Sequence, residues 1–480
     1  MMIQTILQGC EVVQAVPVVI IPQMDRSGEA GSKGVTLLAV LVGLLLAAAV
    51  LAHWPNWISG PWYWNWWWTR RPAVPIYGGF AVAALPLFVG LVLFERGKVG
   101  ARSLILLATA TAFLMRLAWV WAQSPTHDLS YLVYSVRHPY ISSAYVDAAA
   151  LAPVKGWLAH YHEFSVNLNV HSRNKPPGPI LLYLTVIRMM GDSSRTALIC
   201  GGLMAALQAC SVIACAFLLR TLARDATVAA LGACYLALCP GFIVPFPMID
   251  PLYTLFAAPL VALWVTAIER DRFTWSVPAG VMLALSLMMM FNFLVIGFFM
   301  AAFPLFASGR SFSGGLLRMI RHGAVMVGVT LVGYLLMYLA TGFNLIATFA
   351  AAVHNQKLMD ASPLQIRPWP QTILFDLLDF ALGAGWMAVA LAAMWLWRVR
   401  SDGASARLLR IVVLCVLQLV VVAVTGLLAA ETLRVWNFLL PMLILPAALE
   451  MAWISPKARL AIYAVLWLVL GAVAQNMTFH

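Results

Sequence analysis

The chain has 480 residues, of which 63% are hydrophobic and only 10% are charged, and its formal net charge is +12 at pH 7. A soluble domain needs far more polar surface than this composition offers. Because the basic residues lie mostly in short loops between apolar runs, the positive charge indicates membrane orientation and not a nucleic-acid partner.

Apolar runs long enough to cross a bilayer recur along nearly the whole chain. They are continuous and rich in Leu, Ala and Val instead of alternating, which favours helices over a closed barrel. We therefore predict an all-α polytopic membrane protein with about thirteen transmembrane helices. The predicted spans are 34–53, 76–94, 103–122, 196–219, 226–244, 252–268, 275–291, 293–308, 320–341, 378–397, 410–429, 435–453 and 459–476.

The distribution of Lys and Arg predicts a cytoplasmic N-terminus, because every loop then assigned to the inside carries basic residues. Residues 1–33 form a predicted cytoplasmic tail, and residues 34–476 form one multi-span domain. This orientation requires the short apolar run 177–191 to stay on the outer side, so we predict a juxtamembrane helix there. The predicted outer segments are 54–68, 123–195, 245–251, 341–377 and 430–434. The first of these is rich in Trp and is interpreted as an interfacial aromatic belt.

The outer loop 123–195 carries two motifs that could support chemistry. Asp128 follows Ser-Pro-Thr-His just beyond a span, where a carboxylate can act as a general base or cap a helix. Near the end of the loop, the sequence His171-Ser-Arg-Asn-Lys-Pro-Pro-Gly-Pro presents His171, Arg173 and Lys175 on one stiff turn. Such a group suits a phosphate at the depth of the lipid headgroups, or it holds basic side chains that reach the interface.

Two further outer turns carry ionisable residues. Asp250 stands before Pro251 at the mouth of two spans, where an acid is either functional or the N-cap of the next helix. Glu431 and Arg434 are three residues apart, so they can pair on one helix face or point into the outer mouth.

These motifs, in this order and on this side, resemble the C-fold superfamily of membrane glycosyltransferases, which includes protein O-mannosyltransferases and the aminoarabinose transferase of lipid A. The resemblance covers about residues 100–455. It implies a donor sugar on a polyprenyl or dolichyl phosphate, an outer-face reaction with inversion, and a glycan, lipid or protein acceptor. It also implies a multi-pass protein of a bacterial inner or plasma membrane.

Carried over by position, the resemblance makes Asp128 the catalytic base and Asp250 the second acidic residue. His171, Arg173, Lys175 and Arg434 would hold the donor phosphate, and Glu431 would support them. The family's first-loop motif is commonly Asp-Glu, whereas Leu129 follows Asp128 here, so Asp147 is the alternative base. A divalent metal is compatible with the family but is not supported by clustered ligands, and no cofactor is assigned.

Two other functions share parts of this pattern. A carrier or flippase of lipid-linked sugars would use the same spans and phosphate-binding cations without a poised carboxylate. A ligase that uses a diphosphate-linked donor would place its chemistry in the late outer loop, where His354 and Arg367 are the candidates.

Overall fold

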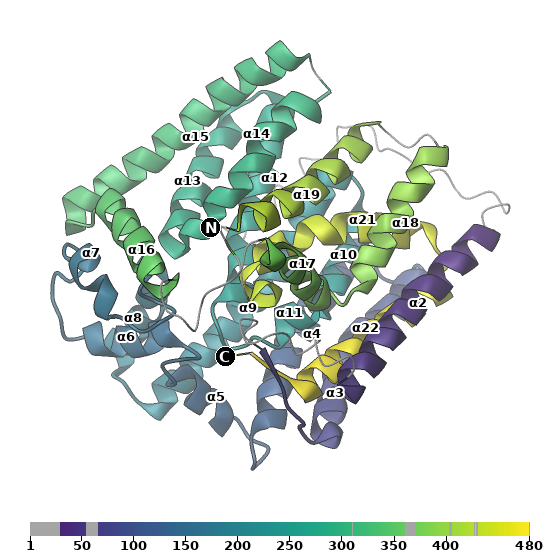
Figure 1. Cartoon of the computed structure of the whole chain (residues 1–480), viewed down its shortest axis with the longest axis horizontal. Coiled ribbons are helices and arrows are strands. Elements are labelled where there is room, and N and C mark those ends of the chain that lie inside the picture. Colours follow the sequence, from purple (N-terminus) through teal and green to yellow (C-terminus); the bar gives the residue numbers. More distant parts are fainter. Residues whose placement is uncertain are drawn as a thin grey trace.

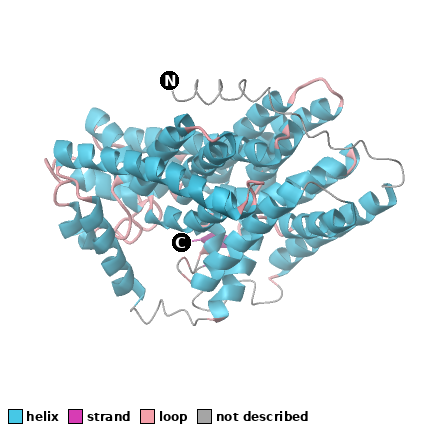
Figure 2. Ribbon diagram, turned by 90° about the horizontal axis from the view of Figure 1, so that it is seen from above, coloured by secondary structure: helices cyan, strands magenta, loops and turns pink. Residues whose placement is uncertain are grey.

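The computed structural model describes residues 29–53, 66–309, 311–360, 370–402, 406–426, 428 and 431–479. The described chain is mainly helical, and its strands form one antiparallel pair, β1 (Trp66–Trp68) with β2 (Met477–Phe479). Figure 2 shows this dominance of helix. The all-α fold class is therefore confirmed, with a small strand pair that joins the segment between α2 and α3 to the end of the described chain.

Eight described helices are long and apolar enough to cross a membrane, and a ninth span is counted if one bent pair crosses as a unit. They are α2 (Glu29–Ala52), α3 (Ala73–Glu95), α4 (Ala101–Gln123), α9 (Ser194–Ala223), η5 with α12 (Asp250–Arg270), α15 (Phe312–Thr341), α19 (Ala406–Thr425) and α22 (Pro456–Asn476). A multi-pass membrane protein follows from these helices.

The predicted count of about thirteen spans is not confirmed, because five predicted spans correspond to short or broken helices. They are α10 (Ala226–Ala237), α13 (Phe273–Met289), η6 with α14 (Phe291–Phe306), the pair α17 (Gln371–Gly383) and α18 (Met387–Asp402), and η8 with α21 (Asn437–Trp453). Proline and glycine account for two of the breaks. Pro240 begins α11 (Pro240–Ile243) directly after α10, and Gly385 has a φ of +77° at the bend of 99° between α17 and α18.

The short helices α10 and α21 form the centre of the molecule. Almost every residue of each is buried, and α10 packs against α4, α9 and α21. The long helix α15 lies at the periphery, where Leu331, Leu335 and Leu339 expose most of their side chains along one face. Apolar side chains that face outward in this way are expected where a helix contacts lipid.

The loop between α4 and α9 folds into short helices, as Figure 1 shows at one side of the molecule. These are α5 (Ser130–Val136), α6 (Ser143–Leu151), α7 (Tyr161–Phe164) and α8 (Gly178–Met190). The expected helix over 177–191 is present as α8, and its buried face includes Tyr183, Leu184 and Ile187. It packs against α6, while α7 contacts α16 (Leu345–Asp360), so two distant outer segments meet.

Candidate functional site

A buried group of charged side chains lies where three distant segments meet. Asp250, the first residue of η5, accepts a hydrogen bond of 2.7 Å from Arg434 Nη1, and its other carboxylate oxygen lies 3.5 Å from Lys175 Nζ. The side chains of Asp250, Arg434 and Lys175 are exposed by only 2%, 4% and 12%. Burial of this degree is costly for charges unless they are paired, as they are here.

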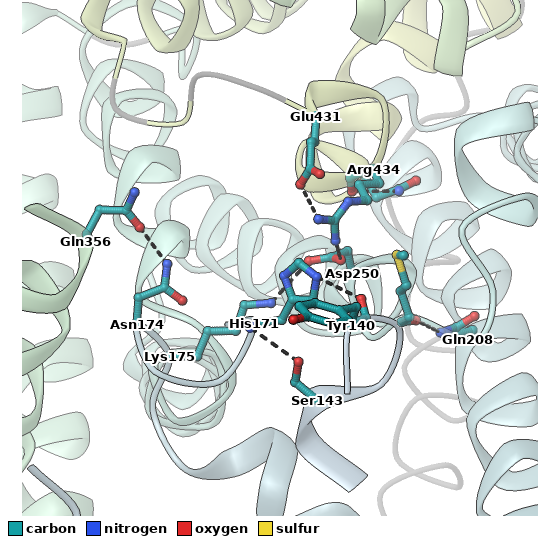
Figure 3. A network of polar contacts seen from close by, with 12 residues as sticks. Tyr140, Ser143, His171, Asn174, Lys175, Gln208, Asp250, Gln356, Glu431 and Arg434 are labelled. Atoms are coloured by element: carbon teal, nitrogen blue, oxygen red, sulfur yellow. Dashed lines mark hydrogen bonds and ion pairs between the residues drawn. The ribbon is translucent and has the colours of Figure 1, made fainter. Parts of the chain in front are cut away.

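Glu431 and His171 complete what we call the charged cluster: His171, Lys175, Asp250, Glu431 and Arg434. Figure 3 shows these five side chains directed toward one another. Glu431 pairs with Arg434 Nη2, so that two cations face two carboxylates. The charges of the cluster are thus close to balance.

His171 contributes a neutral imidazole to the charged cluster. Its Nε2 lies 3.0 Å from the carbonyl oxygen of Tyr140, which can only accept, so Nε2 carries the proton. Burial and the neighbouring Arg434 and Lys175 lower the pKa of His171 to about 3. A neutral ring protonated at Nε2 leaves Nδ1 as an acceptor.

The turn that carries Lys175 is held from both sides. Tyr161 Oη donates to the Lys175 carbonyl at 2.8 Å, and the Asn174 amide donates to Gln356 Oε1 on α16 at 2.5 Å. Gly178 at the start of α8 packs so closely that an added Cβ would lie 2.3 Å from the carbonyl oxygen of Met288. The Pro-Pro-Gly segment therefore combines a stiff backbone with a close approach that only glycine permits.

Arg434 lies on α20 (Thr432–Val435), and Asp379 of α17 holds this short helix in place. The Asp379 carboxylate accepts from the Leu433 backbone N–H at 2.8 Å, and the Thr432 hydroxyl lies 3.1 Å from the same oxygen. Asp379 is 2% exposed. The sequence analysis missed this residue, although an acid inside an apolar run was a usable signal.

Asp250 is positioned by two polar side chains of neighbouring helices. Arg116 of α4 donates to Gln208 Oε1 at 2.9 Å and to the carbonyl of Phe242 at 2.8 Å. Gln208 of α9 in turn donates to the carbonyl of Met248, two residues before Asp250. Gln208 was not among the expected site residues, and its place within a span was the only available sign.

Asp128 does not belong to the charged cluster in this structure. It is exposed and accepts hydrogen bonds of 2.8 Å from Ser124 Oγ and from the backbone N–H of Ser130. Hydrogen bonds from Ser130 and Ser124 hold the pKa of Asp128 well below its usual range. Asp128, to which the resemblance gives the role of catalytic base, thus makes its hydrogen bonds within its own loop, at the start of α5.

Asp147 and Arg173 lie in the same loop and support the turn. Asp147 is buried and accepts from the backbone and side-chain nitrogens of Asn169 at 3.2 and 2.6 Å, and burial raises its pKa. Arg173 Nε donates to the Leu168 carbonyl, and the Arg173 carbonyl accepts from Asn355 of α16. Both residues fix the segment that leads to His171.

The other residues predicted from the sequence lie in different environments. Asp250 lies at the centre of the charged cluster, where it contacts both Lys175 and Arg434. His354 is exposed on α16, whereas Arg367, residues 1–28 and most of the Trp-rich stretch 54–68 lie outside the described residues. The described part of the chain holds no group of three or more His, Cys, Asp or Glu side chains arranged for a metal ion.

Comparison of the chain with models of known protein families and with curated protein sequences gives no match.

Proposed function

We propose that this protein is a membrane glycosyltransferase that moves a sugar from a polyprenyl-phosphate donor to an acceptor hydroxyl. In this proposal the loop between α4 and α9 lies on the outer face of a bacterial inner or plasma membrane, and the charged cluster holds the donor phosphate. The acceptor is a glycan, a lipid or a protein that reaches this face.

The observation that carries the proposal is the unused hydrogen-bonding capacity of the two buried cations. Lys175 has three ammonium donors, and its ion pair with Asp250 is its single ion-pair contact within the described residues. The Nε of Arg434 is buried and has no hydrogen-bond partner among those residues. Buried donors without partners are costly, and a phosphate oxygen would satisfy them.

The location of the cluster fits a lipid-linked anion. Asp250 is the first residue of a helix of spanning length, and Lys175 lies just before the apolar helix α8. A phosphate on a polyprenyl chain has its charge at the surface of the hydrocarbon and its chain within it. Cations at the ends of apolar helices would therefore meet the phosphate at the depth where the lipid places it.

A bound phosphate would compete with Asp250 for the two cations. Lys175 and Arg434 are paired with Asp250, and Arg434 is also held by Glu431. When phosphate oxygens take over part of these contacts, Asp250 loses stabilisation of its charged form and becomes a stronger base. Glu431 keeps Arg434 in place during this exchange.

The chemical step then runs as a displacement at the anomeric carbon. The acceptor oxygen forms a bond to this carbon, the bond from carbon to phosphate oxygen breaks, and the acceptor proton goes to Asp250. The phosphate changes from a diester with one negative charge to a monoester with two, while Asp250 becomes neutral. The total charge of the site is unchanged, and the fixed cations stabilise the charge that develops on the leaving phosphate.

Asp250 takes the role of base that the sequence resemblance gave to Asp128. Asp250 contacts both cations proposed to bind the donor, whereas Glu431 pairs with Arg434 and the contacts of Asp128 are local to residues 124–130. General-base catalysis requires a carboxylate within hydrogen-bond reach of the acceptor hydroxyl. We therefore assign the role of base to Asp250, the acid beside the proposed donor site. Asp128 keeps the role of ordering the start of α5.

The test is a transfer assay with radiolabelled polyprenyl-phosphate sugars, a panel of hexoses and pentoses, and membrane vesicles that carry the native acceptor. Wild-type protein is expected to release polyprenyl phosphate and label the vesicles. Asp250→Asn is expected to bind the donor but to lose at least about 100-fold in transfer. Donor movement across the bilayer without cleavage, in wild type and Asp250→Asn alike, would identify a carrier and reject the transferase.

A further inference from the structure

A separate cavity of about 340 Å³ lies beside the charged cluster, between the loop that carries α5 and the turn before Asp250. Its walls come from five parts of the chain, including β2 at the C-terminal end of the described residues. The lining residues are Arg71, Pro72, Trp119, Ala122, Gln123, Tyr131, Ser135, Ile141, Val244, Pro245, Phe246, Pro247, Met248 and Met477. This volume is at the small end of the range of ligand pockets, about 300–1,000 Å³, and suits one or two sugar-sized rings.

The wall of the cavity combines side chains fixed by hydrogen bonds with a buried hydroxyl that lacks a hydrogen-bond partner. The Ser135 hydroxyl is fully buried and has no hydrogen-bond partner among the described residues, and Tyr131, one helical turn earlier, presents its phenol to the same space. Trp119 is fixed by a hydrogen bond of 2.9 Å from its indole nitrogen to the Val244 carbonyl. Aromatic faces with nearby hydroxyl and amide groups are suited to a ring that carries several hydroxyls.

The cavity is joined to the charged cluster by two short stretches of chain. Met248 lines the cavity, and Asp250 follows two residues later. Ile141 also lines it, and the preceding residue Tyr140 accepts the hydrogen bond from His171. The side chains of Asp250 and His171 do not line the cavity, so a molecule in it would be linked to the charged cluster through these two stretches of chain.

The charge of the lining restricts the ligand. Arg71 is its single cation, anchored by hydrogen bonds of 2.9 and 2.8 Å to the carbonyls of Ala474 and Met477, and none of the lining residues carries a carboxylate. A protonated amino group would be buried beside a guanidinium with no acid in the wall, which is unfavourable. Neutral and acidic rings meet no such penalty.

We propose that this cavity binds the sugar ring of one of the two reactants and that it accepts neutral or acidic pyranoses but not amino sugars. The proposal rests on the transferase function and names the substrate class of that site. Either reactant, the donor or the acceptor, could supply such a ring. In both cases Tyr131 and Ser135 would bind ring hydroxyls, and Trp119 and Pro245 would form the apolar wall.

The experiment is saturation-transfer NMR on the full-length protein in detergent, with methyl glucoside, methyl glucuronide and methyl glucosaminide as probes. Wild-type protein is expected to show binding of the first two and at least about tenfold weaker binding of the third at pH 6, where the amino group is almost fully protonated. Ser135→Phe, which fills the cavity, is expected to abolish the signal, while Ser313→Phe, an exposed serine far along the chain on α15, keeps it.

A second variant covers the case in which Ser135→Phe does not fold. Tyr131→Phe removes one hydroxyl from the wall and is expected to weaken binding by roughly 2- to 10-fold, the value of one hydrogen bond. Folding of each variant is checked by its thermal unfolding temperature. Probe signals that survive in Ser135→Phe, or that are strongest for the glucosaminide, would overturn the proposal.

Competition identifies which reactant supplies the ring. A polyprenyl-phosphate sugar that displaces the methyl glycoside marks the donor, whereas a methyl glycoside that stays bound alongside it marks the acceptor. None of these measurements needs turnover. Failure of the transfer assay with intact probe binding would thus reject the transferase alone, and loss of probe binding with intact transfer would reject the cavity proposal alone.

Discussion

Replacing Asp250 by Asn removes the carboxylate on which the charged cluster depends. The amide retains one oxygen that can accept from Arg434, but its NH₂ group then faces the Lys175 ammonium, whose nitrogen lies 3.5 Å from the native oxygen. Two buried cations lose a shared partner, although Glu431 still holds Arg434. Breaking a buried ion pair by removing one partner costs about 3–5 kcal/mol, and the retained Glu431 contact places this variant near 3 kcal/mol.

The free energy of unfolding of purified protein, measured by denaturant titration in mixed micelles, tests this value. The sharper control is the double variant Asp250→Asn with Lys175→Met, which also removes the stranded ammonium. We expect the double variant to be more stable than Asp250→Asn alone by at least about 1 kcal/mol, because the uncompensated charge is gone. Strictly additive losses, or a cost below about 1 kcal/mol for Asp250→Asn, would refute the ion-pair description.

The remaining predictions concern residues around the cluster. Asp379→Leu should destabilise the protein by about 1–3 kcal/mol, because the buried Leu433 N–H loses its acceptor, and denaturant titration measures the loss. His171 is neutral in the folded state because its pKa is lowered to about 3, so the stability that it contributes is complete above the ordinary histidine pKa of about 6.5 and is lost as the pH falls toward 3. His171→Gln should therefore flatten the fall in stability between pH 7 and pH 4.5, and an unchanged slope would show that His171 does not set it. Asp128→Asn, at an exposed loop position, should leave the transfer rate within about threefold of wild type, since it contacts no cluster residue; a loss as large as that of Asp250→Asn would restore Asp128 as the base.

Hydropathy predicted the membrane class and the eight long helices, because a continuous apolar run has few alternatives to a helix in lipid. It could not separate a spanning helix from a broken one of equal apolarity. The run 226–244 ends its first helix before Pro240, and the run 378–397 bends by 99° at Gly383–Gly385. Backbone groups freed at such a break can find hydrogen-bond partners inside the protein. At the bend between α17 and α18, for example, Tyr235 donates to the Ala384 carbonyl at 2.9 Å.

The sequence also indicated most members of the charged cluster, since Lys175, Asp250 and Arg434 are ionisable groups at the ends of apolar runs. Their pairing depends on tertiary contacts between segments that are distant in the sequence, since positions 175 and 434 are separated by 259 residues. No local sequence pattern encodes such contacts. Asp128 looked equally suitable, but its own loop supplies the Ser124 hydroxyl and the Ser130 backbone N–H, which satisfy it locally. Short-range hydrogen bonds of this kind compete with long-range ion pairs and explain its separate place.

Binding of polyprenyl phosphate to the purified protein tests the central claim most directly. Titration of the wild type, Lys175→Met and the matched exposed variant Lys155→Met, followed by ³¹P NMR, compares a cluster cation with another lysine of the same loop. We expect Lys175→Met to weaken binding at least about tenfold, the value of one charge-assisted contact, and Lys155→Met to bind as the wild type does. Equal affinity in Lys175→Met and the wild type would contradict a phosphate site at the charged cluster.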